Sequence, residues 1–330
     1  MSLGWRRRLA HALTGSPAKP VILMYHRVAT PASDPWDLAV GPERFEAQME
    51  LLRRRRTPLP LAEFVARLEA NDLPRDAVAV TFDDGYADNL TVAKPRLEAH
   101  GVPATVYLVS ESIGSDREFW WDELARLILD RRAPLHGTLQ LSAEQRIGLV
   151  VEDAAAAEGP WRGWEPPRNA RERTFVEVWS RLRDMDPGAR AAAMDGLRIL
   201  CAAAPADQAD LPMTAAQVRD LVSGGLIAAG AHTRTHAHLP SLPDAAQRHE
   251  IAGSRTACEA LAQQAVTQFA YPYGEYDARA EAVVRDAGFD CAVTTHEGPV
   301  RPGRTNPFAL PRLQVLDWDV DAFDAALRMA

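Results

Sequence analysis

The sequence has few cysteines, no long apolar run and no excess of positive charge. Its three cysteines are an odd number and show no CxxC spacing, which argues against a disulfide framework or a cysteine-built zinc site. No stretch approaches the ~18 apolar residues of a membrane-spanning helix. The 37 Lys and Arg against 45 Asp and Glu give a formal net charge of −8, whereas a nucleic-acid binder is expected to be basic. These absences predict a protein of a reducing compartment with no nucleic-acid partner.

The composition is that of an ordinary globular protein. Of 330 residues, 47% are hydrophobic and 25% are charged, so the chain can bury a sizeable core. This length allows two domains, or one barrel-sized domain with an insertion.

Residues 1–19 form a basic N-terminal segment. Its apolar stretch, Leu9–Leu13, is too short for the hydrophobic region of a signal peptide. We expect a solvated basic helix; the alternative is a weak membrane-surface contact, with Trp5 and Leu9 inserted beside Arg6–Arg8. The lack of a signal-peptide pattern in this segment, together with the unpaired cysteines, predicts a cytoplasmic protein. The alternative is a cytoplasmic protein associated with the membrane.

Strand and helix patterns alternate along most of residues 20–330. Short, continuous apolar runs are typical of buried parallel strands, and helical patterns lie between them. About seven such units favour a closed α/β barrel, which carries its chemistry at the carboxyl ends of its strands. The predicted strands lie within residues 21–26, 77–82, 104–110, 226–233, 266–274, 290–295 and 308–315.

A helical insertion is expected at about residues 111–212, where no buried strand is evident. Apolar residues at helical spacing within 120–128 and 175–182 predict two helices with aromatic faces. Trp161 and Trp164 lie instead in a loop rich in Trp and Pro, so they are the aromatic residues with a case for sugar contact.

Two aspartates end the second predicted strand. Asp83 and Asp84 precede Gly85, and two carboxylates so close require a cation or a shared proton. The alternative is a polar turn that caps the next helix.

Two histidines follow another predicted strand end. His232 and His236 are spaced i, i+4, which places both imidazoles on one side of a helical turn. With one aspartate they form a three-ligand site that leaves positions open for water and substrate, which is the catalytic pattern. The second aspartate is then free to act as a base.

A third motif, FAYPYGEYD, contains Pro272 and Gly274 after a further strand. A tight turn there can present a backbone N–H to an anionic tetrahedral intermediate.

Taken in order, these motifs resemble a known family. TFDDG (81–85), HTRTH (232–236) and YPYG (271–274), with MYHRV (24–28) and WWDEL (120–124), resemble the polysaccharide deacetylases of the NodB-homology group, carbohydrate esterase family four. Those of bacterial surface-polysaccharide loci look most similar. The resemblance covers roughly residues 21–110 and 214–315.

The resemblance implies a deformed (β/α) barrel and a role for each matching residue. Asp83 matches the catalytic base, and Tyr273 matches the residue whose main-chain N–H helps to bind the oxyanion. Asp84, His232 and His236 match the ligands of a divalent metal, expected here to be zinc, with cobalt or nickel as alternatives. The implied activity is metal-dependent hydrolysis of N-acetyl groups on amino sugars of a surface polysaccharide or its precursor.

The sequence departs from the family at the base-orienting arginine, because Ala270 occupies that position. Arg312, within LPRLQV, is predicted to supply the cation by an ion pair with Asp83. The alternative is an exposed pair with Asp317 or Asp319.

The sequence also lacks the late Leu-His pair whose histidine acts as acid in many members. His26, at the end of the first strand, is the best substitute and His296 the second; His26 can equally be a structural histidine. His238 is expected to be a second-layer or surface residue.

Two other functions stay open at this point. One is hydrolysis of a formyl group or a cyclic amide on the same fold; the other is a catalytically inactive carbohydrate-binding protein. The expected partner in the leading hypothesis is an N-acylated amino sugar carried on an oligosaccharide, a lipid or a nucleotide.

Overall fold

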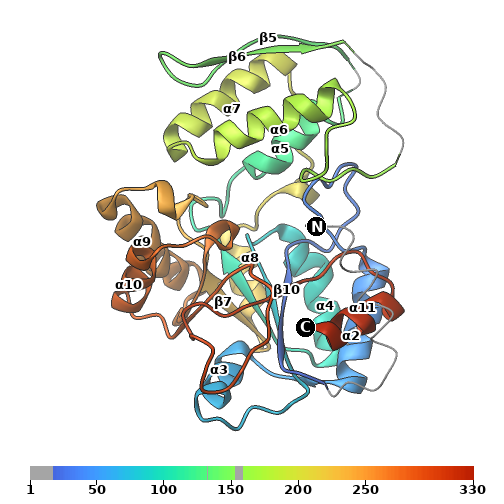
Figure 1. Ribbon diagram of the computed structural model, residues 1–330, viewed down its shortest axis with the longest axis vertical. Helices are drawn as coiled ribbons and strands as arrows, with labels where there is room; N and C mark the ends of the chain where they lie inside the picture. Colours follow the sequence, from blue (N-terminus) through green and yellow to red (C-terminus); the bar gives the residue numbers. More distant parts are fainter. Residues whose placement is uncertain (1–17, 132, 153–158) are drawn as a thin grey trace. The chain divides into compact units, whose positions relative to one another are not determined.

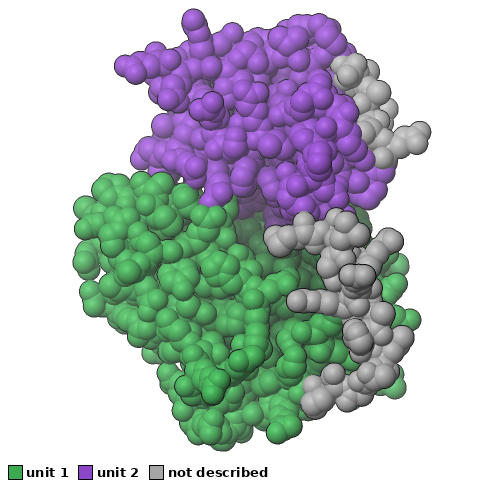
Figure 2. Space-filling view, in the orientation of Figure 1, with its two compact units in different colours: residues 1–30, 39–113, 213–330 green, residues 31–38, 114–212 purple. Residues whose placement is uncertain are grey.

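The computed structural model describes residues 18–131, 133–152 and 159–330. They form two compact units, coloured separately in Figure 2, and Figure 1 labels their helices and strands. The described part of unit 1 comprises residues 18–30, 39–113 and 213–330, and that of unit 2 comprises 31–38 and 114–212 with the gaps above. The predicted membrane-contacting residues Trp5 to Leu9 lie outside the described residues. In the described ranges, no helix has the length and apolar character to cross a membrane.

Unit 1 is a deformed (β/α) barrel, which confirms the predicted fold class. Its parallel strands follow one another in the order β10-β1-β3-β4-β7-β8-β9, and the short β2 (Thr57–Pro58) pairs beside β3. Leu310, just before β10, bridges Val293 of β9, so the chain leading into β10 brings the two ends of the curved sheet together. The other strands are β1 (Val21–Tyr25), β3 (Ala77–Phe82), β4 (Ala104–Leu108), β7 (Ile227–Ala231), β8 (Gln268–Ala270), β9 (Cys291–Val293) and β10 (Leu313–Gln314).

Helices surround this sheet, as expected for a parallel strand–helix alternation. In Figure 1, α9 packs beside α10 and α11 beside α2. One further helix, α3, contributes Phe64 and Leu68 to the same apolar cluster as Ile22 and Ala79 of the barrel interior, so it fills the barrel from the strands' amino-terminal side. The helices are α2 (Pro42–Arg55), α3 (Leu61–Glu69), α4 (Lys94–His100), α8 (Ala215–Val222), α9 (Asp244–Ala262), α10 (Ala278–Asp286) and α11 (Val320–Met329).

Side-chain alternation along β3 positions the candidate site. Successive residues of a strand point to opposite faces, and Val78, Val80 and Phe82 pack in the outer core beneath the helices. The intervening positions face the barrel interior, where Thr81 is fully buried. Asp83 is the next residue on that inward side, which places its carboxylate at the carboxyl end of the barrel.

Unit 2 contains helices and, contrary to the sequence analysis, a two-stranded antiparallel hairpin. The hairpin joins β5 (Leu135–Gln140) to β6 (Arg146–Val151). Every second side chain of β6 is buried and the others are exposed, so the hairpin lacks the continuous apolar run used to recognise strands. The two predicted aromatic helices are present as α5 (Trp120–Ile128) and α6 (Ala170–Arg183), followed by α7 (Pro187–Cys201).

Candidate active site

The carboxyl ends of the barrel strands bring the predicted site residues of unit 1 together. Asp83 and Asp84 follow β3, His232 follows β7, and His26 follows β1. Arg312 reaches them from the segment that leads into β10. These residues are distant in sequence, but the carboxyl ends of the parallel strands all lie at one end of the barrel. Active sites of such barrels are found at that end.

Asp84, His232 and His236 form a buried three-ligand group. Nε2 of each histidine lies 3.6 Å from Oδ1 of Asp84, and the three ligand atoms lie within 4.8 Å of one another. A separation of 3.6 Å is too long for a hydrogen bond, but it is close to the about 3.3 Å between ligands of a tetrahedral zinc ion. The donor set of one carboxylate and two imidazoles therefore fits a divalent metal.

A backbone carbonyl fixes the orientation of His232. Its Nδ1 lies 2.8 Å from the carbonyl oxygen of Ala270, and because a carbonyl only accepts, Nδ1 carries the proton and Nε2 presents its lone pair. Burial lowers the pKa of His232, against the opposing effect of Asp83. The neutral imidazole that a metal requires is therefore the favoured form.

The segment that joins the two histidines is not the helical turn predicted from their spacing. It is an irregular loop in which Thr233 and His236 have positive φ angles of 62° and 54°. The carboxylate of Glu250, on α9, accepts hydrogen bonds from the backbone N–H groups of Arg234 (2.8 Å) and Thr235 (3.0 Å). Glu250 thus shapes the ligand loop, and no short motif in the sequence marks it.

Asp83 is clamped by Arg312, as the sequence analysis predicted. Nη1 and Nη2 of Arg312 donate to Oδ1 and Oδ2 of Asp83 at 2.7 and 2.6 Å, and both side chains are buried. The arginine is itself held by the carbonyl of Thr294 (2.8 Å) and the hydroxyl of Thr81 (3.1 Å). Burial alone would raise the pKa of Asp83, but the charge and hydrogen bonds of Arg312 bring it down to about 2. Asp83 is therefore ionised at neutral pH.

The alternative partners considered for Arg312 are engaged elsewhere. Asp317 pairs with Arg44 at 3.0 Å and accepts from the N–H of Gly41. Asp319 caps the amino terminus of α11. An exposed pairing of Arg312 is thereby excluded.

His26 lies beside the base, whereas the side chain of His296 is exposed. Nε2 of His26 is 3.9 Å from Oδ2 of Asp83, and the side chain keeps 14% of its surface exposed. Burial lowers its pKa to about 4, against the opposing effect of Asp83. His296 has an exposed side chain, and its backbone carbonyl accepts from the N–H of Arg312.

Tyr273 occupies the tight turn after β8. Its φ of 60° and that of Gly274, 70°, lie in the left-handed region. At Gly274 a Cβ atom would also overlap Thr295, so this position requires glycine. The Tyr273 ring packs edge-on against the imidazole of His236, with centroids 4.7 Å apart. The turn and the metal-ligand loop are therefore in direct contact.

A second contact joins the same two loops. Nε2 of His238 hydrogen-bonds Oε2 of Glu275 at 2.8 Å, and the His238 and Tyr273 rings lie edge to face, with centroids 6.1 Å apart. His238 thus lies in a second layer around the ligands, within the alternatives predicted for it. Glu275 was not singled out from the sequence, because a lone glutamate after a turn carries no recognisable signal.

We expect Glu275→Ala to weaken divalent-metal affinity by less than ~10-fold, below the ~10–100-fold lost when a partner bonded directly to a ligand is removed, because Glu275 acts through His238. Without this acceptor, His238 no longer fixes the loop that carries His236. Glu275→Gln keeps an oxygen acceptor and should change the affinity little. Isothermal titration calorimetry with the metal measures the affinity of both variants. An equal loss of affinity in Glu275→Ala and Glu275→Gln would show that the charge of Glu275, and not its hydrogen bond, is what matters.

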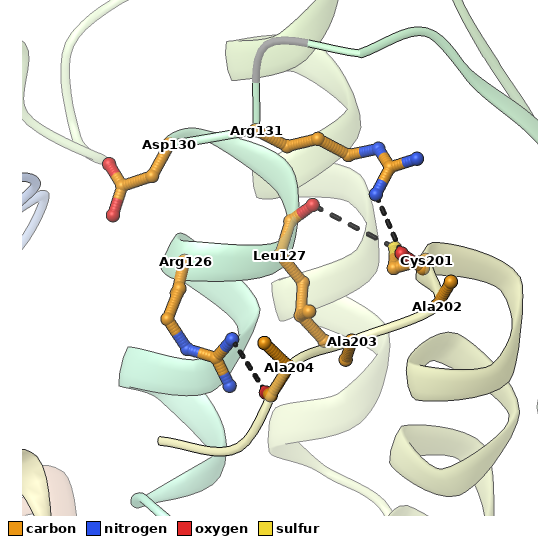
Figure 3. A pocket seen from close by; sticks show the side chains of 8 residues that line it. All are labelled: Arg126, Leu127, Asp130, Arg131, Cys201, Ala202, Ala203 and Ala204. Carbon is orange, nitrogen blue, oxygen red and sulfur yellow. Dashed lines mark hydrogen bonds between the residues drawn. The ribbon is translucent and has the colours of Figure 1, made fainter. Parts of the chain in front are cut away.

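Unit 2 carries a pocket of about 250 Å³ that includes none of the predicted site residues (Figure 3). Arg131 and Arg126 at its wall donate to the carbonyls of Cys201 (2.7 Å) and Ala204 (3.3 Å). Burial raises the pKa of the Cys201 thiol, so the thiol is protonated and a poor nucleophile. The hydrogen bonds of Arg131 and Arg126 therefore have a structural role, because they join the end of α5 and the residues after it to the end of α7.

The fold and the site together define a (β/α)-barrel protein with a buried Asp–His–His group suited to a divalent metal. A family model described as polysaccharide deacetylase matches residues 70–132 and 202–292. The "Putative polysaccharide deacetylase YxkH" of Bacillus subtilis (strain 168) is 36% identical over 103 residues, which are 31% of this chain and 36% of that relative. The match thus spans little more than a third of the relative's length.

Two solved structures share the fold of this chain. IcaB from Ammonifex degensii has a TM-score of 0.58 at 19% identity, covering 95% of this chain and 98% of its own. The Streptococcus pyogenes deacetylase PplD, in complex with acetate, has a TM-score of 0.56 at 18% identity, covering 91% and 94%. With the matching family model, these similarities confirm the predicted resemblance to the polysaccharide deacetylases.

Proposed function

We propose that this protein is a metal-dependent hydrolase that removes N-acetyl groups from amino sugars of a surface polysaccharide or its precursor. The observation that carries the proposal is the pairing of Asp83, clamped by Arg312, with the adjacent Asp84–His232–His236 group. An ionised base next to a metal site is the arrangement that amide hydrolysis by water requires.

In this mechanism Asp84, His232 and His236 would hold the divalent ion, with zinc as the expected metal. Such an ion would supply Lewis-acid polarisation of the acetamide carbonyl and of the attacking water. Asp83 accepts the proton of the attacking water, and Arg312 keeps the carboxylate oriented. The main-chain N–H of Tyr273 donates to the oxygen that becomes negative. The sequence offered His26 as the group that protonates the leaving nitrogen, but its pKa of about 4 leaves it neutral at neutral pH. The proton that Asp83 took from water is therefore the one passed to the leaving nitrogen, and the products are a free amino sugar and acetate.

The position of Arg312 argues against the alternative of an inactive carbohydrate-binding protein. That alternative rested on the missing arginine at position 270 and the missing late histidine. The guanidinium of Arg312 reaches the site from the segment that leads into β10 and binds both oxygens of Asp83. A binding protein has no need of a buried, bidentately oriented carboxylate, so the hydrolase is favoured.

The test of the proposed function is hydrolysis of a substrate panel. Purified protein with added Zn²⁺, Co²⁺ or Ni²⁺ is incubated with N-acetylated and N-formylated oligosaccharides and with lipid-linked and nucleotide-linked amino sugars. Acetate release and the mass of the sugar product are recorded. Release of formate without acetate would identify the other acyl hydrolase, and no product with any metal would reject the proposal.

We expect one divalent ion per chain in the wild-type protein and markedly reduced occupancy in Asp84→Ala and His236→Ala. Each substitution removes one of three ligands, and a two-ligand site holds a metal weakly. Elemental analysis after equilibration with limiting zinc measures the occupancy. Full occupancy in both variants would show that the metal lies elsewhere.

The predicted cytoplasmic location and the membrane-surface contact of the N-terminus remain predictions. Cell fractionation of the tagged full chain distinguishes a soluble, a membrane-bound and an exported pool. Release of a membrane-bound pool by high salt would support contact through Arg6–Arg8, because such charge attraction is screened.

A further inference from the structure

Unit 2 carries a continuous row of four indole rings that the proposed chemistry does not use. Trp164, Trp36, Trp179 and Trp120 follow one another with centroid separations of 6.4, 4.4 and 6.2 Å. Trp164 is 56% exposed, and the other three are half-buried. Trp164 is thus the exposed end of the row, and the other three rings pack against the unit 2 core while keeping part of their surface accessible. Exposed apolar surface marks interaction sites.

The exposed end of the row is rigidly held. The N–H of Gly163 donates to the carbonyl of Pro35 at 2.7 Å, and Arg162 pairs with Asp37. These contacts join the loop that carries Trp164 to the loop that carries Trp36. Trp36 lies so close to Gly163 that a Cβ there would be 2.5 Å from Cη2 of the ring. Rings fixed in this way bind a ligand with little further loss of conformational entropy.

A neighbour in the same loop shows that the exposure of Trp164 is not forced by the chain. Trp161, three residues earlier, is buried and packs edge-on against Phe175 of the unit 2 core, at 6.1 Å. The expectation that Trp161 contacts a sugar is therefore wrong for its ring, whereas Trp164 is accessible. One loop thus places one indole in the core and turns the other outward.

Two of the arginines beside the row have acidic partners, and a third, Arg190, is buried with its guanidinium 5.2 Å from the Trp120 centroid. Arg162 pairs with Asp37, and Arg183, whose guanidinium lies 5.7 Å from the Trp179 centroid, is 3.7 Å from Asp184. Binding to an anionic membrane surface relies on an excess of Lys and Arg, which these pairs do not supply. Rigid aromatic faces bordered by neutralised hydrogen-bonding groups instead complement an uncharged glycan, which has apolar ring faces and polar edges.

We propose that the Trp164–Trp36–Trp179–Trp120 row binds the chain of the N-acetylated glycan, through stacking of sugar rings on the indoles. This inference rests on the proposed function for the identity of the ligand class. It assigns unit 2 a binding role separate from hydrolysis.

The test measures binding without turnover. Asp83→Asn protein, which should not consume the probe, is titrated by calorimetry and indole fluorescence with β-1,4- and β-1,6-linked hexamers of N-acetylglucosamine. Adding Trp164→Ala should lower the affinity for a bound hexamer by at least ~10-fold, since exposed tryptophans at binding surfaces often dominate the energy. Trp164→Phe keeps a ring and should retain most of the affinity.

Ile199→Ala is the matched control, because Ile199 is an apolar residue of α7, also in unit 2, that is 80% exposed. It should bind the hexamer like its parent. Equal affinity in the Trp164→Ala protein, or no hexamer binding by the parent, would overturn the proposal. Binding to phosphatidylglycerol vesicles that Trp164→Ala abolishes, without hexamer binding, would assign the row to a membrane instead. Acetate release by the wild-type protein is scored separately, so failure of the row and failure of the proposed hydrolysis are distinguishable.

Discussion

Asp83→Asn should lower the deacetylation rate by ~10²–10⁴-fold, the scale for a positioned acid–base group, while leaving the divalent ion in place. The amide cannot take a proton from water, but the Asp84, His232 and His236 ligands are unchanged. Arg312 can still donate to the amide oxygen of the substituted side chain, so the local geometry should persist. Acetate release and elemental zinc content, measured on the same sample, report the two effects separately.

Two further substitutions make this result specific. Asp84→Asn should instead reduce the zinc content, because a neutral amide is a poorer ligand than a carboxylate. Asp88→Asn is the matched control: Asp88 is also a buried aspartate paired with an arginine, Arg27 at 3.0 Å. It should destabilise the fold yet retain turnover. Loss of zinc from Asp83→Asn would mean that the roles of the two neighbouring aspartates are wrongly divided.

Arg312→Ala is expected to lower the free energy of unfolding by about 3–5 kcal/mol, the usual cost of leaving one partner of a buried ion pair uncompensated. Asp83 and Arg312 are both buried, so water cannot replace the lost guanidinium. The catalytic rate should fall as well, because the carboxylate loses both hydrogen bonds that orient it. Denaturant unfolding and acetate release measure the two quantities.

The conservative substitution separates charge from geometry. Arg312→Lys keeps the positive charge but lacks the planar fork that binds both carboxylate oxygens, so the rate should fall more than zinc affinity does. Arg67→Lys is the control, since Arg67 forms an exposed helical pair with Glu63 and such pairs contribute little. An unchanged rate in Arg312→Lys would show that a point charge suffices and that the bidentate clamp has no catalytic part.

The sequence by itself determined the barrel and the main residues of the candidate site. Continuous apolar runs such as Val21–Tyr25 and Ala77–Phe82 identify strands buried on both faces. Because parallel strands end at one edge, polar residues directly after them can be grouped without knowing the tertiary structure. That reasoning brought Asp83, Asp84 and His232 together. It also assigned Arg312, because a charge within an apolar strand needs a partner.

Only the tertiary structure decided the features that depend on contacts across the chain. The His232–His236 segment is a loop held by Glu250 of α9, and Glu275 reaches His238 across two loops; neither glutamate has a local pattern. The β5–β6 hairpin has one exposed face. Its strands therefore contain no continuous apolar run, and the sequence between the predicted helices does not identify them. Residues 31–38 group with unit 2 because Trp36 packs on Gly163 and Trp179. The periodicity of apolar residues indicates which face of a helix or strand is buried. Which other element packs on that face is decided only when the whole chain folds.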